Sequence, residues 1–354
     1  LDVRLIVPRH EAAAAHACDA YTRVSGEPAV TMACAGPGAA NLLAGIMCAE
    51  AEGSPVVAIT TTRRSDIADA YLQQGGMQVS RHLEIFKPAV KWNGMVAHWQ
   101  RIPDMVRHAF RVALSGRPGP THILIPEDII SQRGDDTAVT ILPPDRYRLT
   151  TRVPADPEVI RRAAQMLAEA DLVNIHCGNG AERSGAADEV RLLAEHLGCP
   201  VTHTIRARGI IPDDHPLCFH PTCMSRIAAN GQADVVLAVG TRLGELNMWG
   251  RPPMFGEPDK QRLIQIDTEP THIGLNRPTD IALIGDARAV LKQLLQALRQ
   301  RTAKKEAHAK VAEFRALQDQ FDQELNTALE DTARRPMLTG QILKACNDFF
   351  GDDA

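Results

Sequence analysis

The sequence predicts an α/β protein with two doubly wound parallel-sheet domains and the start of a third domain. Short apolar segments alternate with helical segments along most of the chain, which is the pattern of parallel strands joined by covering helices. The chain has 354 residues, more than one ordinary hydrophobic core accommodates. A polar, proline-rich stretch from Pro143 to Pro154 divides the alternating pattern into two sections, as a linker would.

The first section, residues 1–145, is expected to form one domain that lacks its first strand, because the chain opens directly on a strand-like segment. The segment 55–60 is apolar without alternation, which indicates a strand buried on both faces. The alanine-rich run after Glu11 favours a helix. We expect strands over 3–7, 29–33, 55–60 and 121–125, and helices over 11–24, 38–52 and 101–114.

The second section, residues 155–300, repeats the alternation and predicts a Rossmann-like domain. We expect strands over 172–176, 200–204, 233–240, 262–267 and 281–286, and helices over 156–170, 186–197 and 287–301. The remaining residues, 301–354, begin as a charged, alanine-rich stretch over 302–326. We expect that stretch to be a solvated helical connector, followed by a helix over 337–350 that starts a further domain.

Composition excludes several classes of function. The formal net charge of −4 provides no basic footprint for nucleic acid, and no apolar run is long enough to span a bilayer. The eight cysteines form no CxxC pair, which favours buried, reduced thiols in a cytoplasmic protein. Cys218, His220 and Cys223 would offer zinc ligands if they folded together, although a chance grouping in a loop is favoured over a zinc site.

Five motifs, taken in order, carry the chemical interpretation of the first section. Arg9-His10-Glu11 places a carboxylate at the start of a predicted helix, and Gly36-Pro37-Gly38 with Asn41 opens the next helix. The segments 45–59, 87–92 and 116–120 follow. This series resembles the pyrimidine-binding domain of thiamine-diphosphate enzymes of the acetolactate synthase and benzaldehyde lyase type.

That resemblance implies that Glu11 is the catalytic acid/base that hydrogen-bonds the aminopyrimidine of the cofactor, a role suited to a buried carboxyl with a raised pKa. The alternative is an acid that merely favours the helix macrodipole. Gln78 is expected to contact the substrate, with an exposed loop glutamine as the alternative. Gly36, Pro37, Gly38 and Asn41 are expected to shape the turn beside the pyrimidine, where the glycines have a conformational role.

The second section resembles the central domain of the same enzymes. In acetolactate synthases this domain binds a non-redox FAD, whereas other members bind ADP or nothing. The sequence departs from the acetolactate synthase pattern after Arg242, where Leu243-Gly244-Glu245-Leu246 replaces phenylalanine, two aspartates and arginine. An empty crevice therefore stays open as the alternative. The residues that the resemblance assigns to FAD or ADP are Gly178, Gly180, Arg242, Asp267 and Asp286.

The resemblance implies a transferase or lyase dependent on thiamine diphosphate that joins pyruvate to a second 2-oxo acid, releasing CO2 and an acetohydroxy acid. The alternatives are a lyase of the 2-hydroxyacyl or benzaldehyde type, or a non-catalytic nucleotide-binding module or subunit. In the family, Mg²⁺ is held by a Gly-Asp-Gly…Asn motif of a third, diphosphate-binding domain. That motif does not occur in this sequence, so we assign no metal ligand and expect a fragment that is inactive alone. A homodimer or homotetramer is also implied.

Overall fold

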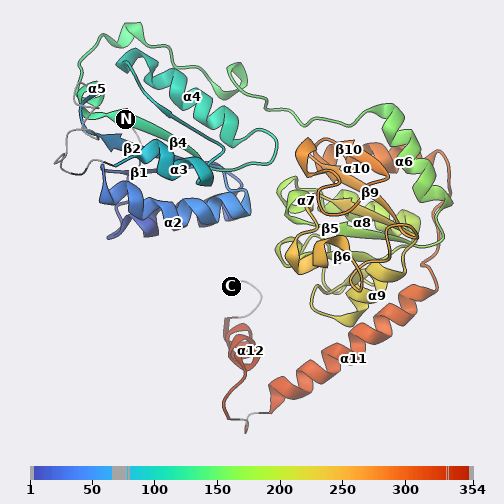
Figure 1. The fold of residues 1–354 in the computed structure, drawn as a ribbon. Helices are drawn as coiled ribbons and strands as arrows, with labels where there is room; N and C mark the ends of the chain where they lie inside the picture. Colours follow the sequence, from blue (N-terminus) through green and yellow to red (C-terminus); the bar gives the residue numbers. More distant parts are fainter. Residues whose placement is uncertain (1–3, 66–77, 79, 332, 334, 351–354) are drawn as a thin grey trace. The chain divides into compact units, whose positions relative to one another are not determined.

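The structure is a computed structural model that describes residues 4–350, apart from 66–77, 79, 332 and 334. It divides into two compact units, residues 1–151 and 152–354, drawn along the chain in Figure 1. The boundary falls inside the predicted linker. Each unit contains one sheet whose strand pairings are all parallel, so the predicted α/β class is confirmed.

The first unit is a four-stranded sheet in the order β1-β2-β4-β3. The predicted helices and the predicted strands over 29–33, 55–60 and 121–125 recur in it, whereas α3, β3 and α5 are additions that the sequence pattern did not indicate. Its elements are α1 (Glu11–Ser25), β1 (Ala29–Ala33), α2 (Pro37–Glu52), β2 (Val56–Thr62), α3 (His82–Phe86), β3 (Trp92–Met95), α4 (Ile102–Ala113), β4 (Thr121–Pro126) and α5 (Glu127–Ile130).

Helices cover both faces of this sheet, which is the doubly wound arrangement. Val56 and Ala58 of β2 pack with Leu42 and Ile46 of α2, whereas Val57 between them packs on the other face in a cluster that includes α4. Successive side chains of a strand point to opposite faces. The continuous apolar run of β2 therefore serves two separate cores, as the sequence pattern predicted.

The predicted strand over 3–7 is wrong for the residues described. Residues 4–8 have no regular secondary structure, and the side chain of Leu5 is 78% exposed. A strand requires a hydrogen-bonded neighbour. Among the described residues β1 forms one edge of the sheet, and its only recorded partner is β2. The apolar composition of 3–7 favours an extended conformation but provides no such partner.

The second unit is a six-stranded sheet in the order β10-β9-β8-β5-β6-β7. The chain builds outward from β5 in one direction and then from β8 in the other, so the strand order reverses between β5 and β8, where open α/β sheets bind ligands. Its elements up to the connector are α6 (Pro157–Glu169), β5 (Val173–Cys177), α7 (Asn179–Arg183), α8 (Ala187–Leu197), β6 (Val201–His203), β7 (Cys218–Phe219), α9 (Met224–Gln232), β8 (Val235–Val239), β9 (Arg262–Asp267), β10 (Ile281–Ile284) and α10 (Ala287–Arg299).

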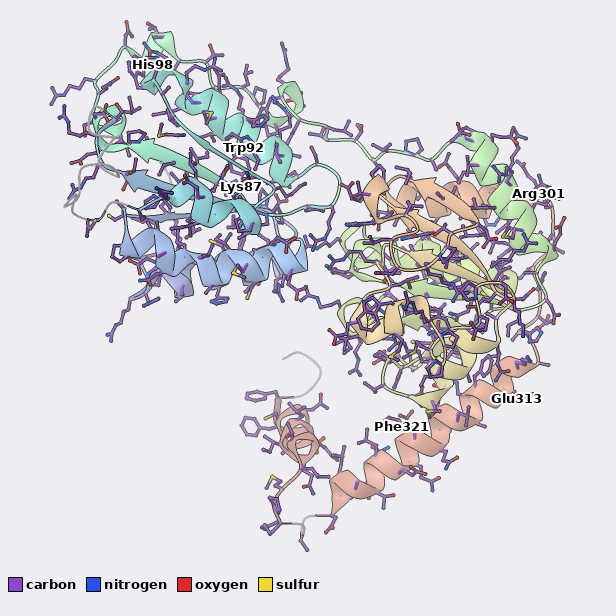
Figure 2. All side chains as sticks on the ribbon, viewed as in Figure 1. Lys87, Trp92, His98, Arg301, Glu313 and Phe321 are labelled. Atoms are coloured by element: carbon purple, nitrogen blue, oxygen red, sulfur yellow. The ribbon has the colours of Figure 1, made fainter. Side chains whose placement is uncertain are left out.

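The connector is helical only from residue 310 on, because residues 302–309 form no helix, and the prediction of a solvated surface is wrong over the first half of its helix. It forms α11 (Lys310–Glu330), which precedes α12 (Thr339–Phe350) and carries Glu313 and Phe321 along its length (Figure 2). Phe314 of α11 is fully buried, with its ring edge-on to Phe219 of β7. Neither α11 nor another helix of the described residues has the length and apolar character needed to cross a membrane.

Candidate functional site

The Glu11 carboxylate lies where the first turns of α1 and α2 meet. His10 is the N-cap of α1, and its Nδ1 accepts a hydrogen bond from the backbone N–H of Ala12 at 3.1 Å. Asn41, in the first turns of α2, donates its side-chain amide to Glu11 Oε2 at 3.0 Å. The two residues are 30 positions apart in sequence, and the structure brings them together as a directly bonded pair.

Glycines of α2 allow the two helices to approach this closely. A Cβ added at Gly38 would lie 3.3 Å from Glu11 Oε1, and one added at Gly45 would lie 2.5 Å from the Ala15 Cβ. Real Cβ atoms do not approach neighbours to 2.5 Å, so Gly45 has a packing role, whereas Gly38 keeps space open beside the carboxylate. Pro37 is the first residue of α2, where its missing N–H costs nothing.

The expected burial and raised pKa of Glu11 are not found in this chain. The carboxyl is only half-buried, and its pKa is lowered by the Asn41 hydrogen bond and by a backbone hydrogen bond within its own helix turn. The helix N-terminus favours the charged form in the same direction. Sequence reasoning anticipated an apolar pocket from the neighbouring alanines, but side chains of a helix point to different faces and these do not enclose the carboxyl.

The Gly36 turn brings Gln78 toward the same end of the sheet. Gly36 has φ +65°, and a Cβ added there would lie 2.9 Å from the Cα of Gln78. A side chain at position 36 is therefore excluded both by the left-handed backbone and by Gln78. Gln78 itself has φ +58° and is exposed. Gln73 and Gln74, which lie near it in sequence, fall outside the described residues.

A buried histidine pair supports the Gly36 turn, and sequence reasoning missed it. His82 Nε2 accepts the Gly36 backbone N–H at 3.1 Å, so its Nδ1 carries the proton and faces the Thr60 hydroxyl at 3.4 Å. That hydroxyl lies 2.8 Å from His122 Nε2. Burial lowers the pKa of both imidazoles, that of His122 to about 3, so both are neutral. The available signal was a histidine inside the apolar strand segment Thr121–Pro126.

At the second unit's switch point, the predicted glycines have internal packing roles. The Gly178 N–H donates to the Val239 carbonyl at 2.8 Å, and the Gly180 N–H donates to the Gly240 carbonyl at 2.9 Å. A Cβ at Gly178 would lie 2.5 Å from that Gly240 oxygen, and one at Gly240, where φ is +60°, would lie 2.5 Å from Ala181 N. The ends of β5 and β8 meet backbone to backbone, which accounts for these glycines without a ligand.

The two predicted aspartates of this crevice also have protein partners. Asp267 Oδ1 accepts the Glu269 N–H at 2.9 Å, and its Oδ2 lies 3.5 Å from His272 Nδ1. Asp286 caps α10 by accepting the Ala289 N–H, and its other oxygen accepts from Arg152 and Ser184. Arg242 is exposed, and its carbonyl accepts from Asn276.

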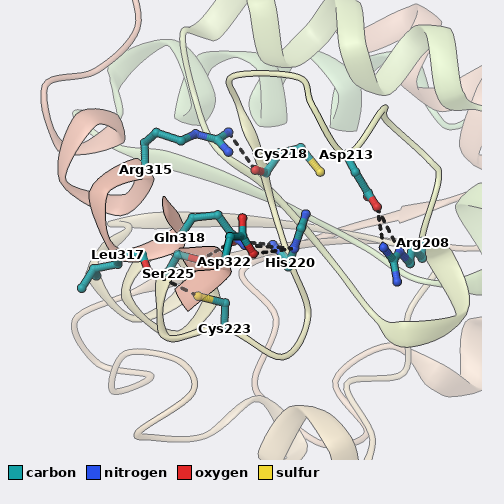
Figure 3. Close-up of polar contacts among 10 residues, drawn as sticks. All are labelled: Arg208, Asp213, Cys218, His220, Cys223, Ser225, Arg315, Leu317, Gln318 and Asp322. Carbon is teal, nitrogen blue, oxygen red and sulfur yellow. Dashed lines mark hydrogen bonds and ion pairs between the residues drawn. The ribbon is translucent and has the colours of Figure 1, made fainter. Parts of the chain in front are cut away.

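The zinc alternative built on Cys218, His220 and Cys223 is not supported by their contacts. Figure 3 shows His220 and Cys223 bonded to α11 instead. His220 Nδ1 pairs with the Gln318 amide at 2.9 Å, and Cys223 Sγ donates to the Leu317 carbonyl at 3.7 Å. These two side chains fix the connector helix to the second unit.

Comparison with known families matches both units of the chain. Residues 1–84 match the family described as "Thiamine pyrophosphate enzyme, N-terminal TPP binding domain", and residues 160–294 match "Thiamine pyrophosphate enzyme, central domain". The two matched ranges contain every site residue that the resemblance assigned, whereas the motif segments 87–92 and 116–120 lie outside them. These matches establish the family, but they do not assign a role to any single residue.

Curated relatives point to the same family. A probable acetolactate synthase large subunit of Methanocaldococcus jannaschii is 36% identical over 305 residues, covering 84% of this chain and 50% of the relative. An acetolactate synthase of Arthrospira platensis is 34% identical, with 83% and 51% covered. One of Mycobacterium leprae is 33% identical, with 84% and 47% covered. The chain thus spans about half the length of the curated relatives it matches.

Proposed function

Because the chain belongs to the thiamine pyrophosphate enzyme family, we propose that it forms the pyrimidine-binding and central domains of an acetolactate synthase-like enzyme. The reaction is the decarboxylation of one 2-oxo acid, pyruvate, and the joining of the remaining two-carbon unit to a second 2-oxo acid. The products are an acetohydroxy acid and CO2. The relatives named acetolactate synthase support this choice of reaction.

The observation that carries the proposal is the Glu11–Asn41 pair at the meeting of α1 and α2. Glu11 Oε2 is occupied by Asn41, whereas Oε1 faces the space that Gly38 leaves by lacking a Cβ. A half-buried carboxyl with one oxygen bonded to Asn41 and the other not crowded by a side chain at position 38 suits a hydrogen bond to the ring nitrogen of an aminopyrimidine. In this assignment Glu11 binds and protonates that nitrogen, and Asn41 orients the carboxyl.

Bound thiamine diphosphate would supply a thiazolium that accepts the electron pair released when the carboxylate leaves as CO2. The chain's own contribution is to position the pyrimidine and to exchange a proton with it through Glu11. Contact with the cofactor removes water from the carboxyl, and desolvation disfavours the charged form. Cofactor binding should therefore raise the pKa of Glu11 from its lowered value, in the direction that general acid catalysis requires.

Product analysis of the complete protein tests this function. With thiamine diphosphate, Mg²⁺ and pyruvate, the expected products are acetolactate and CO2 in a 1:1 ratio. Release of free acetaldehyde from pyruvate would indicate a simple decarboxylase. Cleavage of a 2-hydroxyacyl or benzoin substrate, without acetolactate formation, would indicate a lyase. Either of these results would replace the proposed reaction.

The second candidate, a lyase of the same family, is favoured by the segment after Arg242. Leu243-Gly244-Glu245-Leu246 stands where acetolactate synthases have their usual aspartates and second arginine, and Asp267 and Asp286 are already hydrogen-bonded within the protein.

Binding of FAD to the second unit is a separate proposal. The flavin absorbance of the purified complete protein tests it. Protein that carries ADP or no nucleotide would contradict it.

We also propose a homodimer or homotetramer in the cytoplasm. Exposed apolar side chains suit a subunit interface. In the first unit such side chains lie on α1, β1 and α2, namely Tyr21, Val24, Met32 and Met47. The cysteines are free thiols, as suits a reducing compartment. We propose that Mg²⁺ accompanies the diphosphate, with no ligand assigned in this chain. Sedimentation of the complete protein tests the assembly, and fractionation tests the location.

A further inference from the structure

Three potential ligand atoms converge at the edge of the second unit's sheet. A ring nitrogen of His203, a carboxylate oxygen of Asp213 and Cys218 Sγ all lie within 4.8 Å of one another. His203 is the last residue of β6 and Cys218 the first of β7, and the β6–β7 register pairs Val201 with Cys218. Side chains of positions 201 and 203 lie on one face of the strand, so the pairing places His203 and Cys218 on the same face.

His203 and Asp213 each carry one buried side-chain atom without a hydrogen-bond partner. His203 is fully buried, and its Nε2 has no hydrogen-bond partner; the same holds for the buried Oδ1 of Asp213. A buried polar atom without a partner is costly, and an ion between them would satisfy both. Cys218 is also fully buried, so its sulfur faces the interior and not solvent.

In His203 and Asp213, the second polar atom of the side chain already has a protein partner, and each of these contacts suits metal binding. His203 Nδ1 is bonded to the Thr204 carbonyl at 3.0 Å, which fixes the tautomer that leaves Nε2 as a lone-pair donor. Arg208 donates two hydrogen bonds to Asp213 Oδ2, at 3.0 and 2.8 Å (Figure 3). These two bonds orient the carboxylate, and both go to Oδ2 and not to Oδ1.

From this arrangement we infer that His203, Asp213 and Cys218 form a binding site for a divalent transition metal, with Zn²⁺ as the ion of best chemical match. An imidazole, a carboxylate and a thiolate together suit Zn²⁺. They do not suit Mg²⁺ or Ca²⁺, because these ions prefer oxygen ligands only. Three protein ligands leave the fourth tetrahedral position to water. The Asp213 side chain is 36% exposed, so an ion can enter past it.

The geometry requires a small contraction on binding. Bonds of about 2.0–2.3 Å in a tetrahedral site space the ligand atoms about 3.3–3.8 Å apart. The observed separations of up to 4.8 Å must therefore shorten by at most about 1.5 Å. Asp213 lies in the 204–217 loop between two short strands. Movement of the Asp213 side chain is enough to shorten the distances between the ligand atoms.

An ion here would join β6, β7 and the loop between them beneath the connector helix. Arg315 of α11 donates to the carbonyls of His215, Pro216 and Cys218, and its guanidinium lies 5.0 Å from the centroid of the Phe219 ring. The segment that holds the ion is thus the segment on which α11 rests. This inference does not depend on the proposed reaction, because it concerns a different edge of a different unit.

Zinc titration of the complete protein tests the site. Protein freed of metal by a chelator is titrated with Zn²⁺ against a chromophoric competitor, and one equivalent is expected to bind per chain. Cys218→Ser and His203→Gln are expected to weaken the affinity at least about 10–100-fold, the usual effect of losing metal-site interactions. Cys223→Ser and His220→Gln remove the same residue types nearby and are expected to leave the affinity unchanged.

A second measurement requires no variant and is unaffected by misfolding. X-ray absorption at the zinc edge of the loaded wild-type protein is expected to show one sulfur at about 2.3 Å and nitrogen or oxygen ligands at about 2.0–2.2 Å. A spectrum without sulfur would overturn the assignment, and so would wild-type protein that binds no stoichiometric zinc. Unchanged affinity in a folded Cys218→Ser variant would overturn it as well.

Discussion

The Asn41 side chain donates a 3.0 Å hydrogen bond to Glu11 and so joins the starts of two helices that are separated by a β-strand in sequence. This bond does two things at once. It stabilises the charged form of the carboxyl, and it fixes which oxygen faces the space beside Gly38. Substitution of Asn41 is therefore expected to change the pKa of Glu11 as well as the orientation of its carboxyl group.

Asn41→Leu is expected to raise the pKa of Glu11 relative to the wild-type chain, because the substitution removes the hydrogen bond that contributes most to its lowering. The titration of the Glu11 carboxyl, followed by NMR, measures the change. A Glu11 titration that does not move would show that the Asn41 bond is absent in solution.

Glu11→Gln is expected to reduce turnover of the complete enzyme about 100–10,000-fold, the range typical for loss of a general acid or base. The amide keeps the size of the side chain and a hydrogen bond to Asn41, but cannot exchange the proton. Steady-state kinetics with pyruvate measure the effect, and Glu27→Gln is the matched control. Turnover within about twofold of wild type would refute the acid/base role, whatever the products are.

Gly178→Ala is expected to destabilise the second unit, because its Cβ would lie 2.5 Å from the Gly240 carbonyl oxygen. Overpacking of this kind typically costs about 1–3 kcal/mol. Gly231→Ala is the matched control in the same unit. Its Cβ would meet nothing closer than 3.6 Å, and alanine in helix α9 is about 0.5–1 kcal/mol more favourable than glycine. Urea unfolding should therefore show shifts of opposite sign.

The sequence was sufficient for the parts of this molecule that follow from local pattern. The apolar run over 55–60 indicated a strand buried on both faces, and the two cores confirm it. The resemblance placed the Gly36 and Gly38 turn beside the pyrimidine that Glu11 was expected to contact, and a Cβ at Gly38 would lie 3.3 Å from Glu11 Oε1. Strand β7 was not predicted, because a strand of two residues has no periodicity to detect.

Features that depend on distant neighbours could not be read from local pattern. The low pKa of Glu11 depends on a partner 30 positions away. The buried His82–Thr60–His122 contacts join three separate segments. The convergence of His203, Asp213 and Cys218 likewise arises only when the β6–β7 pairing is formed, and sequence reasoning grouped Cys218 with the wrong neighbours. In each case the missing information was a tertiary contact and not a residue preference.

Stability of the first unit is expected to fall as the pH drops below about 6.5. Burial lowers the pKa of folded His122 from 6.5 to about 3, so the unfolded chain binds the proton first and unfolding is favoured between these two values. One such group contributes a slope of at most about 1.4 kcal/mol per pH unit. His122→Gln should flatten the dependence of the unfolding free energy on pH, whereas the exposed control His16→Gln should leave it unchanged. An unaltered slope in His122→Gln would indicate that folding does not lower the pKa of His122.

The docking of α11 on the second unit predicts that Phe314→Ala is strongly destabilising. Phe314 is fully buried and its ring lies edge-on to Phe219, with centroids 5.9 Å apart. Truncation of a buried phenylalanine typically costs about 3–5 kcal/mol, since it leaves a cavity as well as losing apolar contact. Leu325→Ala on the same helix is the matched control. That side chain is exposed, and surface changes usually stay within about 0.5 kcal/mol. Chemical unfolding of both variants measures the difference, and equal small effects would show that α11 does not pack on the sheet, since a helix free in solution loses little from either truncation.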